Sequence, residues 1–156
     1  IDSLTLAATD PRPETDQGKT DRAALAQRLR SEGMRDYTDR TLIGMMTADN
    51  VRDLPAVADH VRAMMYATPP EGAASALLGR AKRQDYLPLL RRIAAPTLLV
   101  VGRHDTFTPP RLTESMHVLV PDSVVEIIEG AGHLPNLERP ERFNKALRRF
   151  LDHDHT

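Results

Sequence analysis

Two runs of β-branched and aliphatic residues constrain the fold of this chain more than any other feature. Residues 97–101 (TLLVV) form an uninterrupted run without polar alternation, which is typical of a parallel strand covered on both faces. Residues 124–128 (VVEII) form the next strand pattern, and a helical pattern over 109–120 separates the two. A last helix is predicted to begin at Pro140. This alternation predicts an α/β fold with a parallel sheet, right-handed crossovers, and a ligand site beyond the carboxyl ends of the strands.

The first 90 residues have a different pattern. A short apolar run over residues 4–8 ends at Asp10-Pro11 and predicts one more buried strand, followed by a loop to Lys19. Apolar residues at helical spacing then predict four helices, over residues 21–33, 36–46, 53–67 and 71–82. Asp53 is the expected N-cap of the third helix, and Pro88 is expected to keep residues 86–90 irregular. The chain therefore divides into a core strand (1–11), a helical part (12–90) and the remaining core (91–156).

Charge and cysteine content exclude several classes of protein. Lys and Arg total 21 against 22 for Asp and Glu, so the net charge of −1 provides no field to attract nucleic acid or an anionic membrane. Charged residues or prolines interrupt every apolar stretch before the roughly 18 residues that a membrane span needs. The absence of Cys excludes disulfides, thiolate metal sites and a Cys nucleophile, and it fits a reducing compartment, so we expect a cytoplasmic protein.

Asp105 and His133 are the residues most able to carry chemistry. Each follows the end of a predicted strand by four or five residues, and a single helix joins the two strands. If the strands are neighbours, about 4.8 Å apart, both loops leave the same edge of the sheet and the side chains can meet. A carboxylate beside an imidazole holds its Nδ1 proton and stabilises the imidazolium that forms when Nε2 takes a proton. Taken singly, Asp105 could instead cap its turn, and His133 could be a buried, hydrogen-bonded loop residue.

Several motifs in their order along the chain resemble the C-terminal third of the α/β-hydrolase superfamily. They are residues 93–102 (IAAPTLLVVG), Asp105, Pro109-Pro110, Gly130-Ala131-Gly132-His133 and residues 140–143 (PERF). The resemblance implies that Asp105 is the acid and His133 the base of a catalytic triad. It also implies a parallel sheet with crossover helices, an all-helical cap over residues 12–90, and no need for a cofactor or metal. Residues 67–72 (ATPPEG) are similar to those of bacterial esterases and 3-oxoadipate enol-lactonases.

The chain lacks the nucleophile that the resemblance requires. An α/β-hydrolase carries a G-x-S-x-G elbow and an oxyanion loop upstream of the acid and the histidine. None of the serines of the chain lies in such an elbow; they are Ser3, Ser31, Ser75, Ser115 and Ser123. We therefore expect the C-terminal portion of a longer serine-type hydrolase that cleaves a small carboxylic ester or lactone. Its partner would be the N-terminal half of the same enzyme, and this chain alone would be inactive.

Other interpretations of the same pattern remain open at this point. An Asp at the elbow would make the enzyme a dehalogenase or an epoxide hydrolase, and a Ser elbow can also support perhydrolase activity. A non-catalytic chain that serves in binding or assembly is the alternative from a different class.

Two further groups of residues could have a function. Met45, Met46, Met64 and Met65 would line a substrate pocket in the cap, although methionine at helical spacing also serves as ordinary packing. The residues 152–155 (DHDH) could hold a metal adventitiously, but a frayed C-terminus explains them better, so we predict no metal site.

Overall fold

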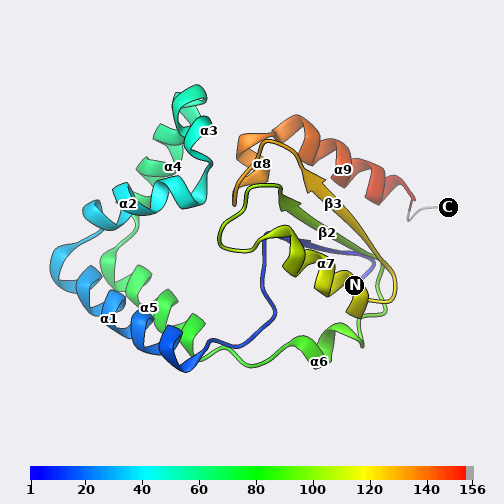
Figure 1. The fold of residues 1–156 in the computed structure, drawn as a ribbon, viewed down its shortest axis with the longest axis horizontal. Coiled ribbons are helices and arrows are strands. Elements are labelled where there is room, and N and C mark those ends of the chain that lie inside the picture. The colour runs from blue at the N-terminus through cyan, green and yellow to red at the C-terminus, as the bar shows by residue number, and fades with distance from the viewer. Residues whose placement is uncertain (154–156) are drawn as a thin grey trace.

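The computed structural model describes residues 1–153, and Figure 1 shows a small sheet-containing core beside a curved arrangement of helices. The strands are β1 (Leu4–Ala7), β2 (Thr97–Gly102) and β3 (Ser123–Ile128). The helices before β2 are α1 (Asp16–Glu32), α2 (Arg35–Met45), α3 (Ala48–Asp53), α4 (Pro55–Ala67), α5 (Pro70–Ala81) and α6 (Leu87–Leu90). The helices after β2 are α7 (Pro110–Leu119), α8 (Pro135–Glu138) and α9 (Pro140–His153).

The three strands form one parallel sheet in the order β1-β2-β3. Thr97 is paired with Leu4 on one side and with Ser123 on the other, so the three strands start almost level. All six residues of β2 are buried, as the unbroken apolar run predicts for a central strand. The parallel sheet predicted from the sequence is therefore confirmed, with strand ends that differ by one residue.

Alternate residues of β2 enter two separate cores on the two faces of the sheet. Leu98 and Val100 pack with Phe150 of α9, while Leu99 packs with Met116 of α7. This alternation follows from the two-residue period of a strand, and it places α7 and α9 on opposite faces of the sheet (Figure 1). Burying a Leu or Val side chain contributes about 1.5–3 kcal/mol, so the two cores fix the sheet between its helices.

Among helices α1 to α5, α1 packs with α5, and α4 packs with both α2 and α3. Thr15 caps α1 by accepting a hydrogen bond from the Gly18 N–H at 3.0 Å, and Gly33 ends the helix with φ of 77°. The α2–α4 pair forms a third core, which also contacts Leu134, just before α8, and Leu137 within α8. The helices are thus anchored on the loop that follows β3.

The two ends of the helical part are joined by hydrogen bonds. The Tyr86 N–H donates to the carbonyl of Pro11 at 3.0 Å. The Arg83 guanidinium donates to the carbonyls of Asp10 and Arg12, the second at 2.9 Å. The segment that leaves the sheet after β1 therefore lies beside the segment that returns toward β2.

The structure differs from the sequence prediction at the short helices and at some helix ends. Helix α1 begins at Asp16 rather than at residue 21, inside the segment predicted as a loop. Asp53 is not the N-cap of α4: it ends α3, a six-residue helix absent from the prediction, and Leu54 occupies the cap position. Pro88 does not keep its segment irregular, because it lies in the first turn of α6, where proline costs no hydrogen bond.

We predict that Gly102→Ala destabilises the fold, because a Cβ at the end of β2 would lie 2.0 Å from the Gly132 carbonyl oxygen, a backbone atom that cannot rotate away. We expect a loss of about 1–3 kcal/mol in the free energy of unfolding, measured by urea denaturation. Gly79→Ala is the matched control, because a Cβ at this position of α5 has no neighbour within 4 Å. It should stabilise the protein by about 0.5–1 kcal/mol. Equal effects of both changes would contradict the prediction.

Candidate active site

Asp105 lies three residues beyond the end of β2, in the loop that leads to α7, and its side chain is fully buried. The backbone N–H groups of Phe107 and Thr108 donate to Asp105 Oδ1 at 2.8 and 2.9 Å. The Thr108 hydroxyl donates to Oδ2 at 2.6 Å. These bonds hold the carboxylate in one orientation and leave Oδ2 available to a further donor.

His133 provides that donor from the loop after β3. Its Nδ1 lies 2.9 Å from Asp105 Oδ2 and 3.5 Å from the Thr108 hydroxyl. The Phe107 ring stands edge-on to the imidazole, with centroids 5.1 Å apart and an angle of 78° between the planes. Because an ionised carboxylate can only accept, Nδ1 carries the proton of the neutral ring, and Nε2 is left with a free lone pair. The two loops thus bring together the residues that the sequence analysis singled out.

The pKa of Asp105 lies below the ordinary value for an aspartate side chain. Burial acts in the opposite direction and raises the pKa. It is outweighed by the hydrogen bonds from the His133 ring and from the Thr108 hydroxyl and N–H, and by the attraction of His133. Asp105 is therefore a buried carboxylate that stays ionised, as a group that must stabilise an imidazolium should.

The backbone around His133 is shaped by glycine and by Glu138. Gly130 has a φ of 74°, which only glycine adopts readily, and Gly132 lies against the end of β2 next to Gly102. The Glu138 carboxylate is 2 % exposed and accepts the N–H groups of Gly132 at 2.7 Å and Leu134 at 3.3 Å. The loop that carries His133 is therefore held by its backbone on both sides of the histidine.

Thr108, Phe107 and Glu138 belong to this site but do not stand out in the sequence. The spacing Asp105-x-x-Thr108 before a proline is one signal for Thr108, since Asp commonly binds backbone N–H groups two and three residues on. Nothing in the sequence pattern identifies Glu138, because its partners come from α3 and from the His133 loop, far apart along the chain.

The four methionines occupy different environments. Met46 is buried, and Met45 and Met65 pack against the same α2–α4 core, whereas Met64 is 46 % exposed. Met46 also borders a hollow of about 390 Å³ that includes His104 and Thr106 from the loop after β2 and Gly130 from the loop after β3. Of the four, Met46 thus lies beside both loops that carry the candidate residues.

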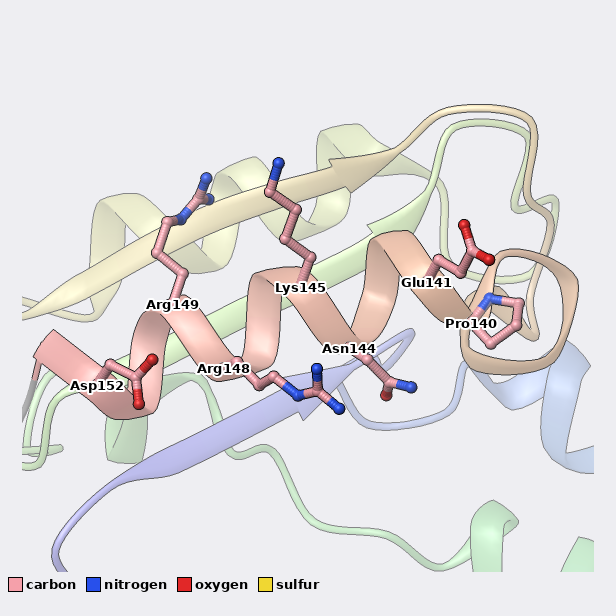
Figure 2. Close-up of a pocket in the computed structure, with 7 residues that line it drawn as sticks. All are labelled: Pro140, Glu141, Asn144, Lys145, Arg148, Arg149 and Asp152. Carbon is pink, nitrogen blue, oxygen red and sulfur yellow. The ribbon is translucent and has the colours of Figure 1, made fainter.

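A second hollow, of about 630 Å³, lies along α9 and away from Asp105 and His133. Figure 2 shows that its lining side chains all project from this one helix. They are Pro140, Glu141, Asn144, Lys145, Arg148, Arg149 and Asp152. Arg149 is paired with Glu126 of β3, and the lining combines both signs of charge. This surface lacks a nucleophile or a positioned acid–base pair, so the candidate site lies at the Asp105–His133 edge.

Two other expectations concern metals and membranes. Within residues 1–153 the structure contains no group of three or more His, Asp or Glu side chains that could hold a metal ion. The residues 152–155, for which we expect a frayed C-terminus rather than a metal site, lie in part outside the described residues. No helix in the described part of the chain has the length and apolar character needed to cross a membrane.

Comparisons with known proteins agree with the fold. The sequence profile of the alpha/beta hydrolase family matches residues 2–146. A pimeloyl-acyl-carrier protein methyl ester esterase of Neisseria meningitidis is 39 % identical over 84 residues, which are 52 % of this chain and 27 % of that protein. The chain thus spans less than a third of the length of this curated relative.

Solved structures match nearly the whole chain. A thermophilic esterase from Thermogutta terrifontis superposes with a TM-score of 0.94 at 37 % identity, over 99 % of this chain and 57 % of that one. An enol-lactonase from Burkholderia xenovorans superposes with a TM-score of 0.87 at 27 % identity, over 97 % of this chain and 56 % of that one. With its parallel sheet, its crossover helices and the matching family profile, the chain belongs to the alpha/beta hydrolase family.

Proposed function

We propose that this chain supplies the acid and the histidine of a serine-type hydrolase that cleaves small carboxylic esters or lactones. The observation that carries the proposal is the 2.9 Å contact between His133 Nδ1 and Asp105 Oδ2 at the carboxyl edge of a parallel sheet. The similarity to an esterase and an enol-lactonase supports this class of substrate. In this proposal residues 12–90 form the cap over the site, and Met46 is a buried packing residue at the border of the hollow beside the two loops.

The nucleophile in this proposal is a serine upstream of the chain. None of the serines that the chain itself contains lies in a G-x-S-x-G elbow, and the two on either side of the crossover from α7 to β3 bond to backbone carbonyls nearby. Ser115 donates to the Arg111 carbonyl within α7, and Ser123 donates to the Val120 carbonyl at the start of β3. Because β3 runs from Ser123 to Ile128 toward the His133 loop, Ser123 lies about 16 Å from that end of the strand.

The reaction then follows from the geometry of the pair. The serine hydroxyl attacks the ester carbonyl carbon while His133 Nε2 takes its proton, and Asp105 stabilises the imidazolium that results. His133 passes this proton to the leaving alkoxide, and an acyl-enzyme remains. Water attacks the acyl group with His133 again acting as the base, which releases the carboxylic acid and restores the serine.

We predict that His133→Ala and Asp105→Asn each lower kcat for ester hydrolysis in the complete enzyme. The expected loss is about 10⁴-fold for Asp105→Asn, since the asparagine would favour the wrong tautomer of the imidazole, and at least as large for His133→Ala. His117→Ala is the matched control, because His117 is exposed near the end of α7 and binds Ser123 rather than the site. Steady-state kinetics of the three variants tests the proposal. Wild-type turnover by His133→Ala would refute it.

We predict that kcat/KM falls as the pH is lowered, because the proposed mechanism needs an unprotonated imidazole to accept the serine proton. Asp105 does not cause this loss, since its pKa lies below its ordinary value and its protonation comes only at lower pH. Because the pKa of Asp105 is lower in the folded protein than in the unfolded chain, its ionised carboxylate stabilises the fold above about pH 4. This stabilisation is lost as the pH falls further and the carboxylate is protonated. Activity should therefore decrease reversibly between pH 7.5 and 5.5 while circular dichroism stays constant. A flat rate over this range, with chemistry rate-limiting, would argue against His133 as the base.

We predict that the 156-residue chain alone hydrolyses no ester, and that adding the upstream half in trans restores turnover. The sequence contains no G-x-S-x-G elbow, and among the described residues no strand pairs with the free edge of β1. Ester turnover, sedimentation and cooperative unfolding of the isolated chain check this expectation. A cooperatively folding monomer with His133-dependent turnover would show that the chain is complete in itself.

A further inference from the structure

Glu138 is a buried carboxylate that the catalytic steps above do not use. It is the last residue of α8, is 2 % exposed, and lies five residues after His133. Four N–H groups converge on its two oxygens, from Thr47, Asn50, Gly132 and Leu134. Burying a carboxylate is costly unless donors compensate it, and these four N–H groups provide that compensation.

One oxygen holds the peptide groups on both sides of His133. Glu138 Oε1 accepts the N–H of Gly132 at 2.7 Å and the N–H of Leu134 at 3.3 Å. These are the residues directly before and after the histidine. The bonds therefore fix the direction in which the His133 side chain leaves the backbone, toward Asp105.

The other oxygen connects the same loop to the helical part. Glu138 Oε2 accepts the Thr47 N–H at 3.0 Å and the Asn50 Nδ2 at 2.6 Å, both at the start of α3. Asn50 continues the network, because its Nδ2 also donates to the Gly130 carbonyl at 2.8 Å and its Oδ1 accepts from Arg139 Nη2 at 2.9 Å.

The two segments meet without space for a side chain between them. A Cβ on Gly132 would lie 3.1 Å from the Thr47 nitrogen and 3.3 Å from the Met46 carbonyl carbon. The His133 loop and the turn between α2 and α3 are thus in backbone contact, and the Glu138 carboxylate is the group that bonds to both.

We propose that Glu138 is a positioning residue: it locks the backbone of the His133 loop onto the start of α3, so that the imidazole keeps its bond to Asp105. The inference rests on the proposed function of His133 as the base. Glu138 is itself too buried to reach a substrate, so its effect must act through His133. Only a carboxylate accepts at both oxygens, whereas an amide of the same shape would turn an NH₂ group toward one of the two pairs of donors.

The first test uses Glu138→Gln in the complete enzyme, with Glu141→Gln, an exposed carboxylate on the next helix, as the matched control. We expect kcat for ester hydrolysis to fall by about 10- to 100-fold, with KM within about twofold, because a small displacement of a catalytic group slows the chemical step more than it weakens binding. Glu138→Asp, which keeps both accepting oxygens on a shorter side chain, should restore part of this loss. The control should keep the wild-type kcat.

The second measurement needs no substrate and therefore separates this inference from the proposed function. The proton between His133 Nδ1 and Asp105 gives a strongly downfield resonance, assigned by its disappearance in His133→Ala. We expect this resonance to weaken or vanish in Glu138→Gln and to persist in Glu141→Gln. If the resonance weakens in Glu138→Gln while His133→Ala keeps full activity, the positioning role of Glu138 stands and the proposed catalytic role of His133 fails.

A purely structural Glu138 would give a different result. Glu138→Gln would then lower the melting temperature but leave kcat and the downfield resonance of the folded protein unchanged, which would overturn the proposal. An increase in KM with unchanged kcat would overturn it as well. If Glu138→Gln fails to fold, Asn50→Ala decides. It removes one donor from Oε2 together with the Asn50 bonds to Gly130 and Arg139, and it leaves the bonds from Glu138 to residues 132 and 134 in place. We expect a smaller loss of kcat for this variant, and wild-type kcat would refute the coupling to α3.

Discussion

Strand β2 is buried along its whole length, and the position of the other elements depends on it. Its side chains alternate between the α9 core and the α7 core, and its two edges pair with β1 and β3 in parallel. At Gly102, the last residue of β2, the backbone of the His133 loop comes very close. A Cβ at this position would lie 2.0 Å from the Gly132 carbonyl oxygen. A strand that is fixed on both faces and both edges cannot shift its register, so the loops beyond its end start from fixed positions. This rigidity allows Asp105 and His133, which lie in two different loops, to keep the hydrogen bond between them.

Two buried carboxylates divide the task of organising those loops. Asp105 bonds to a ring nitrogen and thereby sets the tautomer of His133, whereas Glu138 bonds to peptide groups and thereby sets the path of the chain. Each is compensated by donors rather than by a neighbouring cation: Asp105 by Phe107, Thr108 and the imidazole, Glu138 by amide and backbone N–H groups. Such hydrogen-bond networks stabilise the fold only when they are complete, because the loss of one donor leaves a buried charge incompletely compensated.

The sequence predicts the parts of this architecture that depend on local pattern. The unbroken apolar strands indicate a parallel sheet, and parallel strands end at one edge, so Asp105 and His133 could be expected to meet before any coordinates were known. The short helices α3, α6 and α8 escape prediction, because four to six residues contain too few turns for a period to show. The partners of Glu138 on the helical part escape it for a different reason: Thr47 and Asn50 lie about ninety positions away along the chain, and no spacing rule relates them to Glu138.

The hydrogen bonds that join Asp10, Pro11 and Arg12 to residues 83–86 have a consequence for how such a chain can change over evolutionary time. Because the helical part starts and ends at nearly the same point, its length does not affect the distance that the backbone must bridge between β1 and β2. Lengthening a segment whose ends are already together costs little loop-closure entropy. Insertions and deletions among these helices are therefore tolerated as long as the turn at Thr47 and Asn50 keeps its contact with the histidine loop. Variation in sequence and length can accumulate there while the sheet stays unchanged.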